Sequence, residues 1–164
     1  MNKAFNFENL NISIPKRKSN SHKGLNGRVL VIAGSRGLGG AGIMASEASL
    51  YSGAGLVTLH THKSNVEASL MRNPEVIALG ISKFFPISEN FSVILYGPGM
   101  QNDEWSNKMP EHLKNIPQES SLIIDAGGLQ HLKDHNLTIS NNTILTPHPG
   151  EASNLLEIPI PEIQ

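Results

Sequence analysis

Short apolar runs of three to six residues recur along this chain, and stretches with helically spaced apolar positions separate them. Runs of this length indicate buried strands, whereas apolar positions every three or four residues indicate helices. The pattern predicts strands over residues 28–33, 56–59, 91–96, 122–125 and 143–145. It predicts helices over residues 43–52, 65–71, 104–115 and 152–156. Such alternation predicts a parallel sheet with helices on both faces.

Glycine and turn residues follow four of the predicted strands. These clusters are Gly34-Ser35, Gly97-Pro98-Gly99, Asp125–Gly128 and Thr146–Glu151. In open parallel sheets, ligands bind beyond the carboxyl ends of the strands. The four clusters therefore predict a binding site at that edge, where glycine lets the backbone approach a ligand closely.

The corner at Thr146–Glu151 holds a histidine between two prolines. Pro147 and Pro149 restrict the backbone on either side of His148, and Glu151 falls in the first turn of the next helix, where its charge suits the helix dipole. The corner is either an ordinary tight turn or a stiff support that aims the imidazole at a ligand. His148 is the only histidine braced in this way, so it ranks above the other six as a candidate site residue.

Composition limits the partners that need to be considered. The 164 residues suit one domain, and the hydrophobic fraction of 38% becomes roughly 46% when glycine is counted in place of tyrosine, which is normal for a globular protein. A net charge of −1 provides no bulk attraction to nucleic acid or to a membrane. No apolar run approaches the ~20 residues that span a bilayer, and the absence of cysteine agrees with a reducing cytoplasm. We expect a cytoplasmic protein without nucleic-acid or membrane partners; a homo-oligomer is compatible with the sequence.

Residues 37–42 match the pattern G-x-G-x-x-G that is typical of dinucleotide binding. The first matching glycine comes three residues after Gly34, too far from the strand for the usual tight turn. The next strand ends near His60 and His62 without an acidic residue for a ribose. A nicotinamide-dependent dehydrogenase is therefore disfavoured. A loop whose amides face a phosphate or an amide group fits better, because N–H groups at a helix start attract anions.

The other candidate side chains carry weaker signals. His60 and His62 alternate along a strand, and His131 and His135 are four residues apart, but neither pair has a third ligand nearby. We interpret all four as surface histidines and expect no metal site. Asp125, at a strand end, has three open roles, as a metal ligand, as an orienting group or as a helix cap.

Eight short motifs occur in a specific order along the chain. They are His22-Lys23-Gly24, Val29–Ser35, Gly40-Ala41, Ser52–Thr58, Pro74-Glu75-Val76, Gly97-Pro98-Gly99, Asp125-Ala126 and Thr146–Glu151. Each motif is weak alone, but the ordered set resembles the ADP/ATP-dependent NAD(P)H-hydrate dehydratase family over about residues 14–157.

The resemblance implies a three-layer α/β/α fold of the ribokinase-like superfamily with a mostly parallel central sheet. It also implies a hydro-lyase that repairs hydrated NADH or NADPH, with ADP or ATP and Mg²⁺ as cofactors. The nucleotide would phosphorylate the added hydroxyl, which then leaves as phosphate. Carried over by motif, the residues that contact the hydrated cofactor are Ala41, Gly99 and His148. Additional candidates in matching motifs are Lys23, Gly97 and Glu151.

The chain departs from the family pattern in three places. Leu38 stands where a tyrosine is usual, and Gly127 replaces the second aspartate of an Asp-Ala-Asp-Ala-Leu segment. A Gly-Thr-Gly-Asp segment, whose aspartate is the family's expected catalytic base, does not occur before Gln164. The catalytic aspartate is thus expected beyond Gln164, and no residue here is assigned that role.

We therefore expect a lead-in over residues 1–21 and the N-terminal part of one ribokinase-like domain over residues 22–164, truncated relative to the family. The chain alone is expected to be inactive. Two alternatives stay open. One is a ribokinase-like kinase that acts on a small alcohol, and the other is a truncated, non-catalytic remnant that binds the cofactor.

Overall fold

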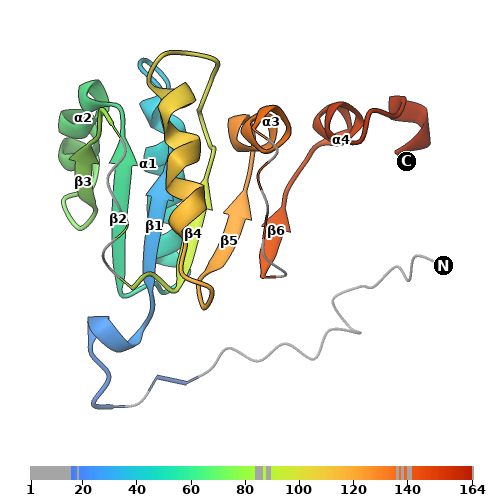
Figure 1. The fold of residues 1–164 in the computed structure, drawn as a ribbon. Helices are drawn as coiled ribbons and strands as arrows, with labels where there is room; N and C mark the ends of the chain where they lie inside the picture. Colours follow the sequence, from blue (N-terminus) through green and yellow to red (C-terminus); the bar gives the residue numbers. More distant parts are fainter. Residues whose placement is uncertain are drawn as a thin grey trace.

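The computed structural model describes residues 16–163 except 18, 84–86, 88–89, 136, 138 and 140–141. Its centre is a six-stranded parallel sheet in the order β3-β2-β1-β4-β5-β6 (Figure 1). The strands are β1 (Arg28–Ile32), β2 (Leu56–Thr61), β3 (Ile77–Gly80), β4 (Val93–Tyr96), β5 (Ser121–Ile124) and β6 (Thr143–Leu145). The α-helices are α1 (Gly39–Tyr51), α2 (Val66–Arg72), α3 (Gly127–Asp134) and α4 (Pro149–Leu156). The 3₁₀ segments are η2 (Lys23–Leu25), η3 (Lys63–Asn65), η4 (Ser106–Asn115) and η5 (Ile160–Glu162).

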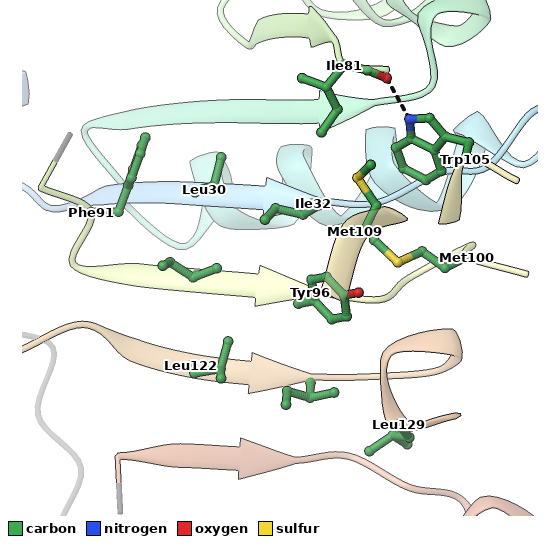
Figure 2. Packing of buried hydrophobic residues seen from close by; sticks show 12 residues of the cluster. Leu30, Ile32, Ile81, Phe91, Tyr96, Met100, Trp105, Met109, Leu122 and Leu129 are labelled. Carbon is green, nitrogen blue, oxygen red and sulfur yellow. Dashed lines mark hydrogen bonds between the residues drawn. The ribbon is translucent and has the colours of Figure 1, made fainter. Parts of the chain in front are cut away.

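One face of the sheet packs against η4 and α3. Leu30 and Ile32 of β1 join Trp105, Met109 and Leu129 in a single buried cluster (Figure 2). Burial of one such side chain contributes about 1.5–3 kcal/mol to the driving force for folding. This cluster therefore holds η4 and α3 onto the central strands.

The opposite face packs against α1. Successive residues of a strand point to opposite sides, so Val31 and Ala33 join Val57 and Leu59 in a second buried cluster. Helices thus cover both faces of a parallel sheet, as predicted. Beside α1, over β4 and β5, lies an apolar hollow of about 480 Å³.

All five predicted strands are confirmed, but the pattern missed a strand and an α-helix and misjudged the start or the type of other helices. It did not indicate the edge strand β3 or the helix α3. Helix α1 begins at Gly39, four residues before the predicted start, because glycines that open a helix add nothing to the apolar period. The stretch predicted as a helix over residues 104–115 is the 3₁₀ segment η4, with Pro110 inside it. Proline lacks the N–H that an α-helix needs at that position.

The interpretation of the histidine pairs as surface residues is wrong for one member of each pair. His60 is 5% exposed and His131 is 4% exposed, whereas His135 is exposed. The ring of His131 shares a hydrogen bond of 2.6 Å with the hydroxyl of Tyr96 and a longer contact of 3.3 Å with Ser106 Oγ. Such partners make burial of an imidazole tolerable. Burial lowers the pKa of His60 to about 4 and also lowers the pKa of His131.

Most of the predicted lead-in lies outside the described residues, namely residues 1–15 and 18. Within the described part, Arg17 Nη2 donates a 2.7 Å hydrogen bond to the carbonyl of Gly53, just after α1. The division into a lead-in and a domain stays a prediction. No helix in the described ranges is long and apolar enough to cross a membrane.

Candidate active site

The loops that follow β1 and β4 meet at the carboxyl edge of the sheet. The strand order runs from β1 outward to β3 on one side and from β4 outward to β6 on the other, so connections diverge between β1 and β4. Ligands of open parallel sheets bind at such a switch point. There Gly34 N donates to Pro98 O and Ser35 N to Gly99 O, each at 2.9 Å. These bonds join two loops more than sixty residues apart in sequence.

Ala41 and Gly99, two of the predicted contact residues, lie against each other at this junction. Gly99 has a φ of +65°, and a Cβ on it would come 2.7 Å from Ala41 Cβ and 2.8 Å from Leu38 O. Any side chain at position 99 would therefore strain the backbone and push the two loops apart. The glycine keeps open a surface of bare backbone beside the first turn of α1.

Gly97 ties the β4 loop to the β5 loop. Its φ is +116°, and a Cβ there would overlap the carbonyl oxygen of Asp125. Ala126, the next residue after Asp125, has a φ of +48°, which is unusual for a residue with a side chain. Strain of this kind persists only where surrounding structure enforces it, and it gathers at binding sites.

Of the two interpretations of the His148 corner, the capping contacts agree with a stiff support, and its bracing is more specific than the prolines indicate. That the corner aims the imidazole at a ligand stays a prediction. His148 is the N-cap of α4: its Nδ1 accepts from Gly150 N at 3.1 Å and from Glu151 N at 3.4 Å. In return, Glu151 Oε2 accepts from His148 N at 3.0 Å. An Nδ1 that accepts leaves the ring proton on Nε2, which lies 3.5 Å from Glu151 Oε1 at the exposed side of the ring. The His148 side chain is 68% exposed, so this corner presents an oriented ring to the edge of the sheet.

Asp125 is held by Thr146, the residue that follows β6, rather than by a helix. Its Oδ1 accepts a 2.8 Å hydrogen bond from Thr146 Oγ1, and α3 begins without a side-chain cap. Of the three open roles, helix capping is therefore excluded. In the described part of the chain, no three His, Cys, Asp or Glu side chains gather closely enough to hold a metal ion.

Lys23 is the one predicted candidate that lies away from the others. It belongs to η2, which precedes β1 at the amino edge of the sheet (Figure 1). The five residues of β1 separate this edge from the carboxyl edge, a distance of roughly 16 Å. Ala41, Gly97, Gly99, His148 and Glu151 all lie at the carboxyl edge instead.

The motifs did not indicate the two side chains that brace the first loop. Thr61 Oγ1 donates to Gly34 O at 3.0 Å, and Asn65 Nδ2 donates to the same oxygen at 2.8 Å and to Ser35 O at 3.2 Å. A Cβ on Gly39 would lie 2.6 Å from Asn65 Cγ. The buried Asn65 thus fixes the path of the loop, and only a polar residue just after a strand could have hinted at it.

Comparison with known proteins shows which family this chain resembles in sequence and in fold. A family model described as NAD(P)H-hydrate dehydratase matches residues 29–163. The ADP-dependent (S)-NAD(P)H-hydrate dehydratase of Staphylococcus aureus is 39% identical over 163 aligned residues, which cover 94% of this chain and 58% of that protein.

Solved structures agree with the sequence match. A ribokinase-like superfamily protein from Enterococcus faecalis superposes with a TM-score of 0.82 at 30% identity, covering 92% of this chain and 55% of its own. The ADP/ATP-dependent NAD(P)H-hydrate dehydratase of Bacillus subtilis, co-crystallised with ATP and Mg²⁺, has a TM-score of 0.75 at 28% identity, with the same coverage. The predicted ribokinase-like fold is thereby confirmed, and the chain spans little more than half the length of these relatives.

Proposed function

This chain belongs to the NAD(P)H-hydrate dehydratase family, and we propose that it supplies the substrate-binding edge of an enzyme that dehydrates hydrated NADH or NADPH. The observation that carries the proposal is the close approach of Ala41 and Gly99 at the switch point of the sheet. Bare backbone at a switch point suits a large, flat ligand because nothing projects into its path.

The chemistry proposed for the whole enzyme removes the elements of water from the ring. A phosphoryl group passes from ADP or ATP to the hydroxyl oxygen, and the C–O bond then breaks with its electron pair leaving on phosphate. A proton leaves the neighbouring carbon, and the ring double bond is restored. The products are the repaired dinucleotide, phosphate and AMP or ADP.

The residues of this chain bind and orient the substrate in this scheme. Ala41 and Gly99 form the floor under the hydrated ring, and the Nε2–H of His148 donates a hydrogen bond to a ligand oxygen. The capping bonds of His148 and Glu151 hold the imidazole in place without help from the ligand. An oriented donor of this kind lowers the entropy lost on binding.

Neither a general base nor a Mg²⁺ site is assigned to the described residues. The carboxylate of Asp125 already accepts a hydrogen bond from Thr146, and no cluster of three metal-ligating side chains is found where the structure describes the chain. Phosphoryl transfer needs a base within hydrogen-bond reach of the attacking hydroxyl. We expect that group, and the nucleotide contacts, to come from polypeptide equivalent to the remaining part of the relatives.

The proposal is tested by binding and by turnover. Hydrated NADH is titrated into the chain by calorimetry, with unmodified NADH as the comparison ligand. Recovery of NADH absorbance is then followed with ADP and Mg²⁺, once for the chain alone and once for a version joined to the equivalent of the remaining part of the Staphylococcus aureus relative. We expect binding by both proteins and turnover by the joined version only. Failure of both proteins to bind hydrated NADH would refute the proposed function.

A further inference from the structure

A cavity opens on the carboxyl edge, over β1, β2 and β3. Its volume is about 440 Å³, within the range of small-molecule sites. Its walls come from the loops that follow β1, β2, β3 and β4, together with the start of η4. None of the substrate contacts proposed above lines this cavity, so those contacts do not explain what it binds.

The cavity carries positive charge that the protein does not neutralise. Of its three cations, Lys108 is paired with Glu104 at 2.7 Å. The side chains of Arg36 and Lys63 make no hydrogen bond or ion pair with any residue that the structure describes. The remaining carboxylate, Asp103, accepts from Ser106 N at 2.7 Å. The two unpaired cations at the mouth of a concave site favour an anionic ligand.

A rigid wall backs the two cations. Trp105 is 7% exposed and donates from Nε1 to Ile81 O at 2.6 Å (Figure 2). The ring of His62 meets the Trp105 ring edge-on, with centroids 6.2 Å apart. These contacts fix the β2, β3 and β4 loops relative to one another, so the cavity exists before any ligand arrives.

The cavity lies beside the candidate active site. Gln101 N donates to Ser35 Oγ at 3.2 Å, and Ser35 N donates to Gly99 O. Arg36 and Gln101, which line the cavity, therefore lie next to the loops that hold Ala41 and Gly99. Five neighbouring strands, from β2 to β6, separate Lys63 from His148, a span of roughly 19 Å at ~4.8 Å per strand interval. An edge this long accommodates a dinucleotide lying across the switch point.

We propose that this cavity binds the diphosphate-bearing adenosine half of the substrate, with Arg36 and Lys63 on the phosphate oxygens. The inference rests on the proposed function, since it divides one dinucleotide between two adjoining sites. The nicotinamide half lies over Ala41 and Gly99 toward His148, and the adenosine half lies on the side of β2 and β3. The cations then provide affinity that does not depend on whether the ring is hydrated.

ADP-ribose tests this division because it contains the proposed cavity ligand and lacks the nicotinamide ring. Its affinity for the chain is measured by calorimetry for the wild type, Arg36→Ala, Lys63→Ala and the matched control Lys114→Ala. Lys114 is an exposed cation that pairs with Glu111 and does not line the cavity. We expect about a tenfold loss for each cavity variant, as for one charge-assisted hydrogen bond, and no change for the control. The melting temperature should hold in both cavity variants, because the side chains of Arg36 and Lys63 have no partner to lose among the residues that the structure describes.

A further variant separates this inference from the proposed function. His148→Ala should weaken binding of hydrated NADH and leave ADP-ribose binding unchanged. Binding of hydrated NADH together with unchanged ADP-ribose affinity in both cavity variants would overturn the inference and leave the proposed function standing. If the wild type does not bind hydrated NADH but both cavity variants lose ADP-ribose binding, the cavity site is supported and the proposed function fails. Absence of ADP-ribose binding by the wild type would also overturn the inference.

Discussion

Acidification should destabilise this protein because a buried histidine must stay neutral in the folded state. His60 is 5% exposed on β2, and its ring centroid lies 6.5 Å from that of His112. Burial, and then the nearby charge of His112, lower the pKa of His60 from 6.5 to about 4. Burial also lowers the pKa values of His112 and His131. All three shifts act in the same direction.

The sign and the magnitude follow from proton linkage. Below the unfolded pKa of 6.5 the unfolded chain binds a proton that folded His60 does not, so the free energy of unfolding falls as the pH falls. The loss continues until the pH reaches the folded pKa of about 4. At ~1.36 kcal/mol per pKa unit, His60 alone should remove about 2 kcal/mol between about pH 7.5 and about pH 5. His112 and His131 add to this loss.

Urea unfolding at a series of pH values measures the effect, with fluorescence of the single tryptophan, Trp105, as the signal. His60→Gln removes the titrating group and keeps a polar side chain, so its pH dependence should be shallower than that of the wild type by about 2 kcal/mol over the same interval. His22→Gln, at an exposed position, is the matched control and should keep the wild-type dependence. An unchanged pH dependence in His60→Gln would refute the reasoning, as would an NMR titration of the His60 ring near its ordinary pKa.

Substitutions in three further regions, with their controls, test other parts of the structure. Gly99→Val should lose about 2 kcal/mol of stability, because its Cβ meets Ala41 at a positive φ. It should also lose binding of hydrated NADH in a calorimetric titration. The control Gly40→Ala, where a Cβ meets nothing within 4 Å, should bind hydrated NADH normally. His148→Asn keeps an N-cap acceptor, so its free energy of unfolding should stay within ~0.5 kcal/mol of the wild type while ligand affinity falls. Loss of the cap in His148→Ala should cost about 1 kcal/mol. Equal stability of the two variants in urea unfolding would contradict the capping role. Ile144 lies on the edge strand β6 and is 59% exposed. Ile144→Lys should reduce aggregation measured by light scattering, because a charge on an edge strand blocks pairing with another chain. Unchanged scattering would show that aggregation does not start from this edge.

Local sequence patterns predicted most of the strands in the sheet. Apolar runs of strand length located β1, β2, β4, β5 and β6, because a strand buried on both faces has a composition that neighbouring segments lack. The pattern missed β3, whose Ile77 and Leu79 are 42% and 44% exposed at the sheet edge. Its short length and partial burial leave only a weak signal.

The sequence by itself determined the class of fold, the carboxyl-edge position of the glycine loops and the braced corner at His148. Each of these depends on residues close together in the chain, where turn chemistry and periodicity act. Ordered motifs added the family, which the comparisons confirmed.

Only the tertiary structure decided which distant residues meet. It joined Ser35 to Gly99, buried His60 and His131 inside the core, and placed Lys23 at the opposite edge from the other candidates. It also gathered Arg36 and Lys63 around one cavity. These contacts depend on the order of the strands across the sheet, and the spacing of residues along the chain does not specify that order.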